Sequence, residues 1–282
     1  MSLRLDLAAI VCLLFVTPVF AQQRPLITED PEVIGAGRIL IEGGIDFAHD
    51  IEYPVSGLTG DLWSIPTVGF SFGLSSIAEF QIDGAVFNHL SITSRNPRAP
   101  LASLVTATGS STNDSGDAIV ATKIRLFTET GHRPAFGLRF ATKLPNASNE
   151  SGLGLDTMDF FATVLAAKTI QSIRLVGNIG AGILTDPTFG SRQNDVLVYG
   201  VSFARALTSQ AELVGELVGR ASTRAAGPLP GTESRGLMKF GGRYTRGTIR
   251  LDSAVFFGLT TVDPTVGFTV GFTYVFNAFR VP

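Results

Sequence analysis

The sequence has little cysteine, little charge and no long apolar run beyond its first residues. Its one cysteine is Cys12, so the rest of the chain can form neither a disulfide nor a thiolate metal site. Only 16% of the 282 residues are charged and the net charge is −2, which excludes the clustered basic surface of a nucleic-acid-binding protein. After residue 21 no apolar run approaches the roughly 18 residues of a helical membrane span. Yet 45% of the residues are hydrophobic, so they must be distributed in another way.

The first 21 residues predict a cleaved secretory signal peptide. Arg4 precedes the apolar stretch Leu7–Val16, and small residues lead up to a cleavage site after Ala21. This is the order of parts in a signal peptide. The alternative is a buried helix or an anchor, but the stretch is too short to span a bilayer.

The last segment of the chain alternates between bulky apolar and small residues. One face carries the bulky side chains Val266, Phe268, Val270, Phe272, Tyr274 and Phe276. The residues between them are threonines and glycines, and a helix would scatter both kinds around its axis, so the pattern predicts a β-strand. The same alternation recurs in about twelve segments of roughly ten to fourteen residues, the length that tilted membrane strands need.

The connections between these segments alternate in length. Short connections are expected near residues 74–76, 129–134, 170–172, 208–209 and 245–247. Long connections are expected near residues 50–60, 89–116, 145–156, 185–194, 221–234 and 260–264. This alternation predicts an all-β protein: a transmembrane antiparallel up-and-down β-barrel of about 12 strands with both termini in the periplasm. The loop at 89–116 is expected either to fold into the lumen or to stay outside.

A secreted β-sandwich is the alternative architecture. Its strands also alternate, but each apolar face would need a second sheet to cover it. A barrel in lipid needs no such cover, and closure satisfies every backbone hydrogen bond in the hydrocarbon. The aromatic composition fits less well, because interfacial girdles are rich in Tyr and Trp, and this chain has four Tyr and one Trp beside 21 Phe.

The predicted domains are a signal peptide at 1–21, a periplasmic N-terminal leader at 22–35 and a β-barrel domain at 36–282. The leader contains the acidic run Thr28–Glu32. This run could hold calcium, although solvation in the periplasm explains it better.

Several short motifs carry a resemblance to a known family. They are RPLITED at Arg24–Asp30, FGLSSIAEF at Phe72–Phe80, Gly116-Asp117 ahead of Lys123 and Arg125, Arg133-Pro134-Ala135 ahead of Arg139 and Lys143-Leu144-Pro145, and Gly154-Leu155-Asp156 ahead of Asp159 and Ala167-Lys168. The chain from about residue 24 to 170 thereby resembles the bacterial outer-membrane transporters named for the meta-pathway of phenol degradation. The resemblance implies a barrel that admits aromatic or other hydrophobic compounds.

The polar positions of the strands are expected to face the lumen, because side chains alternate between the two faces of a strand. The resulting polar candidates for lining the lumen are Glu79, Asp83, Lys123, Arg125, Arg139, Lys143, Arg220, Lys239, Arg243 and Arg250, and the same parity also points Phe127, Phe161 and Phe256 inward. Acidic and basic members on neighbouring strands can pair across the ladder and fill the lumen. The competing interpretation is that unpaired cations line a path for an anionic solute: Arg139, Lys143, Arg220 and Arg250. The three phenylalanines either contact an aromatic solute or pack locally.

The sequence therefore predicts a bacterial outer-membrane channel for passive or facilitated uptake of small solutes. A hydrophobic or aromatic solute is favoured by the resemblance alone. Expected partners are outer-membrane lipid, the solute and the barrel-assembly machinery, with no nucleic acid, no cofactor and no metal. One alternative is a structural or surface-binding barrel with a blocked lumen. Another is an outer-membrane hydrolase using His89, which is disfavoured because no spacing specifies a nucleophile, a base and an orienting group.

Overall fold

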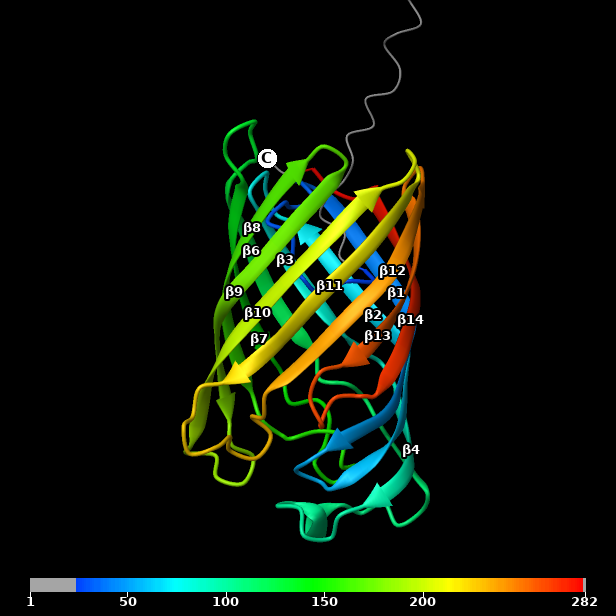
Figure 1. The fold of residues 1–282 in the computed structure, drawn as a ribbon, viewed down its shortest axis with the longest axis vertical. Helices are drawn as coiled ribbons and strands as arrows, with labels where there is room; N and C mark the ends of the chain where they lie inside the picture. Colours follow the sequence, from blue (N-terminus) through cyan, green and yellow to red (C-terminus); the bar gives the residue numbers. More distant parts are fainter. Residues whose placement is uncertain (1–23, 281–282) are drawn as a thin grey trace, which may run out of the picture.

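The computed structural model describes residues 24–280 and forms a closed antiparallel β-barrel (Figure 1). The barrel strands are β1 (Arg38–Tyr53), β2 (Leu58–Gly73), β3 (Ala78–Ala85), β6 (Ile119–Phe127), β7 (Ala135–Lys143), β8 (Asp159–Ile170), β9 (Ile173–Thr185), β10 (Gln193–Ala206), β11 (Ala211–Ser222), β12 (Arg235–Arg246), β13 (Ile249–Gly258) and β14 (Val266–Asn277). Each pairs with its neighbour, and β1 pairs with both β14 and β2. The predicted antiparallel β-barrel of about 12 strands is thus confirmed, while the predicted signal peptide lies outside the described residues.

Two extra strands and a short helix occupy the connection between β3 and β6. These are β4 (Asn88–Arg95), β5 (Ser111–Asp114) and the 3-10 helix η1 (Ala102–Leu104). The long strand β2 pairs with β3 along one half and with β4 along the other. The loop predicted at 89–116 therefore extends the wall beyond the barrel (Figure 1), and it does not line the chamber described below.

Short and long connections lie at opposite ends of the barrel. The short-turn end holds the connections at 74–77, 128–134, 171–172, 207–210 and 247–248, together with the C-terminal end of β14 (Figure 1). The long-loop end holds those at 54–57, 86–118, 144–158, 186–192, 223–234 and 259–265. The length predicted for the connection near 50–60 is wrong, because β1 continues to Tyr53 and β2 begins at Leu58, which leaves a short turn.

The strands are inverted relative to those of a soluble protein. Along β13 the buried positions include Arg250 and Asp252, whereas Leu251 and Val255 are exposed. Exposed apolar area costs about 25 cal/mol per Å² in water, and a lipid environment removes that cost. Among the described residues, no helix has the length and apolar character required to cross a membrane. Because the polar side chains of the strands are buried and the apolar ones exposed, the polar face encloses the lumen and the apolar face forms the outer wall.

An aromatic cluster lies on this outer wall near the long-loop end. Trp63, the one tryptophan of the chain, has its ring centroid 4.7 Å from that of Phe47 and 5.8 Å from that of Phe268. Leu62 lines the lumen, so its neighbour Trp63 must face outward. A tryptophan on the outer wall is typical of the membrane interface.

Candidate functional site

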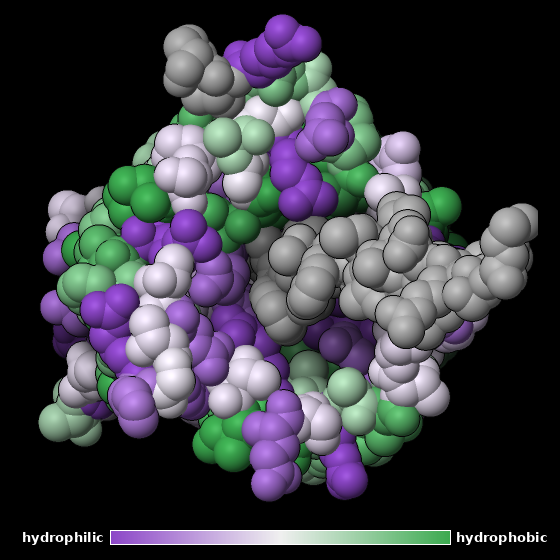
Figure 2. All heavy atoms as spheres, turned by 90° about the horizontal axis from the view of Figure 1, so that it is seen from above, coloured by the Kyte–Doolittle hydropathy of each residue, from purple (hydrophilic) through white to green (hydrophobic). Residues whose placement is uncertain are grey.

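The N-terminal segment before β1 lies inside the barrel. Residues 24–34, here called the inner segment, are largely buried, with Ile34 only 1% exposed. Seen from the short-turn end, hydrophilic residues lie both around the centre and on the rim, whereas most hydrophobic residues lie on the rim (Figure 2). The expectation of a solvated leader is therefore wrong for this part of the chain. Its acidic residues are explained by basic partners on the lumen wall, described next.

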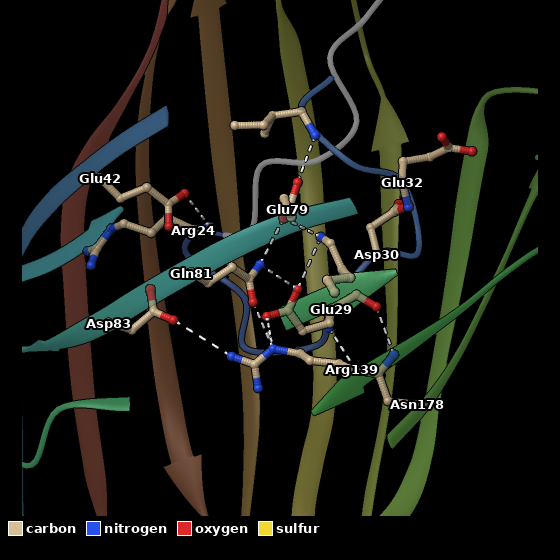
Figure 3. A network of polar contacts seen from close by, with 12 residues as sticks. Arg24, Glu29, Asp30, Glu32, Glu42, Glu79, Gln81, Asp83, Arg139 and Asn178 are labelled. Carbon is tan, nitrogen blue, oxygen red and sulfur yellow. Dashed lines mark hydrogen bonds and ion pairs between the residues drawn. The ribbon is translucent and has the colours of Figure 1, made fainter. Parts of the chain in front are cut away.

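Glu29 is the centre of the contacts between the inner segment and the wall (Figure 3). Its carboxylate lies 2.8 Å from Arg139 Nε and 3.3 Å from Lys123 Nζ. Its backbone amide donates to Asn178 Oδ1 at 2.7 Å, and Asn178 Nδ2 donates back to the Glu29 carbonyl at 2.8 Å. Two charges and a reciprocal amide pair thus hold a single residue, which fixes the segment across the lumen.

Lys123 is a fully buried cation shared by two carboxylates. Its Nζ lies 3.0 Å from Glu79 Oε1, and neither of these side chains is exposed. The two residues are register partners on β3 and β6, as the predicted pairing of neighbouring strands requires. Glu79 also accepts the Ile34 amide at 2.7 Å. Buried charges are tolerated only when they are well paired, so wall and segment depend on each other here.

Arg24 anchors the beginning of the inner segment. Its guanidinium lies 3.5 Å from Asp252 and 3.6 Å from Asp46, and it donates to the Thr269 hydroxyl at 2.6 Å. Gly44 makes room for it, because a Cβ there would lie 2.2 Å from Arg24 Nη2. The slot in the wall is therefore shaped to the side chain that fills it.

Glu216 holds the next part of the segment. Its carboxylate accepts the amides of Ile27 and Thr28 at 2.9 and 2.8 Å, and the Thr28 hydroxyl at 2.7 Å. Lys239 lies 3.7 Å from the same carboxylate and donates to the Pro25 carbonyl at 3.3 Å. The carboxylate thus replaces the water that these amides would otherwise bind.

The segment leaves the lumen through contacts near the short-turn end. Asp30 pairs with Arg174, whose Nη1 in turn lies 3.0 Å from Glu129, and Glu32 pairs with Arg125. Although partial burial opposes it, hydrogen bonds from the amide and hydroxyl of Thr169, with Lys168 and Arg174 nearby, lower the pKa of the Glu129 carboxyl. Glu129, which holds Arg174 beside Asp30 of the inner segment, therefore stays ionised at neutral pH.

The inner segment separates a large chamber from a small cavity. The chamber has a volume of about 600 Å³, is bounded on the segment's side by Ile27 and Glu29, and extends to the long-loop end. Its apolar wall includes Phe161, Leu165, Val198, Val218, Leu237 and Phe256. A second cavity of about 240 Å³ lies among the long loops. On the other side of the segment, a cavity of about 40 Å³ lies beside Leu26 and Thr28.

The structure sorts the predicted lumen residues into groups. Those that contact the inner segment directly are Glu79, Lys123, Arg125, Arg139, Lys239 and Arg243. Asp83 lies 3.7 Å from Arg139, and Lys143 pairs with Asp117 and Asp159 at 3.0 and 3.2 Å. Arg250 lies 3.8 Å from Glu212 beside the small cavity. Arg220, Phe161 and Phe256 line the chamber.

The inward position predicted for Phe127 is wrong. A bulge in the pairing of β6 with β7 falls between Arg125 and Phe127 and breaks the alternation. Phe127 is half exposed near the short-turn end, with the Arg133 guanidinium 4.9 Å from its ring centroid. A bulge shifts every side chain beyond it to the other face, and parity alone cannot detect it.

Sequence reasoning missed several residues that shape the lumen. Asn178 and Gln81 occupy inward positions and bond Glu29 and Arg139, but the predicted candidates comprise charged and aromatic residues alone. Arg235 is also absent from the predicted candidates, although it lines both the chamber and the second cavity among the long loops. The acidic run of the leader was a signal for the basic lumen, since opposite charges can pair when both are withdrawn from water.

The histidines lie outside this constellation. His89 is on β4, where its Nδ1 is 2.6 Å from Asn113 Oδ1 and its Nε2 is 3.5 Å from Ser91 Oγ. Ser91 and Asn113 are exposed and His89 is half-buried. Among residues 24–280, no group of three or more His, Cys, Asp or Glu side chains could hold a metal ion.

Comparison with known proteins gives likeness of fold. No protein-family model matches the sequence, and no curated protein matches it significantly. An outer-membrane channel from Pseudomonas putida F1 is similar in structure, with a TM-score of 0.60 and 13% identity over 88% of this chain and 98% of that one. The NanC porin is similar with a TM-score of 0.51 and 8% identity, over 84% of this chain and 98% of that one. The chain thus shares the fold of outer-membrane β-barrels.

Proposed function

We propose that the protein is a channel of the bacterial outer membrane that takes up small solutes passively or by facilitated diffusion, with apolar and aromatic compounds favoured. The observation that carries this proposal is the chamber of about 600 Å³ inside a closed barrel, with Phe161, Leu165 and Phe256 on its wall. Cavities of roughly 300–1,000 Å³ with mostly apolar walls are typical of small-molecule sites. The outer-membrane channel of similar fold supports the same function.

The proposed location and partners follow from the outer wall and the closure of the barrel. The apolar outer wall suits lipid, and the pairing of β1 with β14 leaves no unpaired strand edge in the hydrocarbon. We place both termini in the periplasm, since short turns face that side in barrels of this kind. Assembly then requires the barrel-assembly machinery. We propose that the protein has no enzymatic activity. We also propose that it belongs to the phenol-pathway transporter family, which residues 24–170 resemble.

A blocked barrel is the second candidate, and the inner segment favours it. Residues 24–34 cross the lumen between the chamber and the cavity of about 40 Å³. In a channel, this segment must move or leave a narrow path. In a structural barrel, it would stay fixed by contacts such as that of Glu29 with Arg139 at 2.8 Å.

Solute flux into proteoliposomes separates the two candidates. The full chain is reconstituted, and uptake of benzyl alcohol and of benzoate is measured alongside single-channel conductance. A channel gives uptake above that of protein-free vesicles. Absence of uptake and of conductance for every solute would refute the channel and leave the blocked barrel.

A further inference from the structure

Two arginines face each other where the chamber meets the second cavity, which lies among the long loops. Arg220 of β11 and Arg235 of β12 are register partners, and both line both cavities. Like charges directly opposite each other across a ladder destabilise a sheet. A solute that enters from the long-loop end and reaches the chamber therefore passes this pair.

Arg220 has no carboxylate within ion-pair distance among the residues that the structure describes. Its Nε and Nη2 donate to the carbonyls of Glu233 and Gly231, at 2.9 and 3.1 Å. The side chain of Glu233 is turned toward the Gly231 amide at 2.9 Å, and nearby Asp159 is bound by Lys143 at 3.2 Å. Of the four cations predicted to be unpaired, this one alone lacks an ion pair within the described range.

Arg235 is only weakly neutralised. It donates to the carbonyls of Val262 and Glu52 at 3.0 and 3.2 Å. Its nearest carboxylate is Asp263, at 3.8 Å, and that group already accepts the Gly236 amide at 2.8 Å and the Thr260 hydroxyl at 2.7 Å. Among the described residues, Asp263 is thus the one carboxylate within ion-pair distance of either guanidinium, while Asp159 and Glu233, which line the same cavity, are engaged by Lys143 and by the Gly231 amide.

The wall becomes apolar immediately beyond the pair. Val218 and Leu237, two residues farther along β11 and β12, are also register partners and line the chamber. Phe161 and Phe256 contribute aromatic rings to the same chamber. A ligand that satisfies both regions must have an anionic head and an apolar body.

We propose that Arg220 and Arg235 bind the carboxylate of an amphipathic monoanion, such as an aromatic carboxylate, whose ring enters the apolar chamber. This inference rests on the proposed channel function and names its substrate class. A guanidinium matches a carboxylate because two N–H groups can donate to two oxygens at once. The bound anion also relieves the repulsion between the two cations.

Binding is tested on the full chain in detergent micelles by titration calorimetry. Benzoate and benzamide are the probes, because they share size and ring but differ in charge. Benzoate is expected to bind at least about tenfold more tightly. Arg220→Gln and Arg235→Gln should each weaken benzoate binding about tenfold, or about 1.4 kcal/mol, and leave benzamide unchanged. The matched control is Arg224→Gln, which removes an exposed cation at the same end of the barrel.

The outcomes separate this site from the channel itself. Equal affinity for the two probes, or an equal loss in Arg224→Gln, overturns the anion site. A loss for both probes in Arg220→Gln assigns that residue to fixing the loop carbonyls of Gly231 and Glu233, and it also overturns the proposal. If benzoate binding depends on the pair but no solute crosses proteoliposomes, the anion site stands and the channel fails. If neutral aromatic solutes cross the vesicle membrane but benzoate binding does not depend on Arg220 and Arg235, the channel stands and the anion site fails.

Discussion

The carboxylate of Glu29 lies 3.3 Å from the ammonium of Lys123, and this contact joins the N-terminal segment to the barrel wall at a point withdrawn from water. Lys123 is unexposed, and its second carboxylate is that of Glu79. The segment is therefore part of the lumen's charge balance as well as an obstacle in it.

Replacing Glu29 with Gln should loosen the inner segment. The change leaves Arg139 and Lys123 short of a carboxylate, and breaking a buried ion pair costs about 3–5 kcal/mol. We expect single-channel conductance of the full chain to rise. The matched control is Glu150→Gln, which removes an exposed carboxylate from the connection between β7 and β8. Unchanged conductance in Glu29→Gln would mean that the segment stays in place without this charge.

Phe272→Arg should destabilise the barrel in lipid. Phe272 lies on the outer face of β14 and is 44% exposed, so a charge there enters the hydrocarbon. The cost is about 2–4 kcal/mol near mid-membrane, measured by urea unfolding in vesicles. Phe279→Arg serves as control, since Phe279 is similarly exposed but lies beyond the strand. Equal stability of the two variants would contradict the assignment of the outer face.

The fluorescence of Trp63 should report lipid contact directly. Because this is the one tryptophan in the chain, its emission is expected to shift to the blue on insertion into vesicles. Brominated lipids should quench it, since the ring packs with Phe47 and Phe268 on the outer wall. Trp63→Phe removes the signal and provides the blank. Quenching by aqueous iodide but not by brominated lipid would place this ring in water.

Acid should weaken the contact of Glu129 with Arg174, which holds Asp30 of the inner segment near the short-turn end. The pKa of Glu129 is lowered in the folded protein from an ordinary value of 4.5. A lowered pKa stabilises the fold above the unfolded value, and that contribution is lost as pH falls through the folded value. We therefore expect wild-type stability to fall below pH 4.5 more steeply than that of Glu129→Gln. Parallel pH profiles would show that Glu129 contributes nothing.

Strand alternation allowed the barrel to be predicted because lipid and lumen impose opposite polarity on neighbouring residues, as Arg250 and Leu251 illustrate. It also allowed the pairing of Glu79 with Lys123 to be anticipated, since both lie on inward positions of adjacent strands. Position along a strand is a local property, and local patterns determine it.

The occupant of the lumen could not be predicted in the same way. Residues 24–34 have no periodicity, and their position depends on contacts across the whole barrel, such as Asp30 with Arg174. Phe127 failed because a bulge is set by the geometry of the β6–β7 pairing. Arg220 was correctly predicted to be unpaired, but it could not be told apart from Arg139, Lys143 and Arg250, which do form ion pairs, because that difference depends on where carboxylates from distant segments lie.

The pairing of β1 with β14 has a consequence for the order of folding. Arg38 and Asn277 are partners although they are 239 positions apart in the chain (277 − 38), so the barrel cannot close until β14 has been made. Contacts of such long range form slowly. Arg24 bonds Thr269 of β14 and lies within 3.6 Å of Asp46 of β1. The Arg24 guanidinium thus holds β1 and β14 together at the last strand pairing to form. A chain truncated before β14 would lack this pairing and the contact of Arg24 with Thr269.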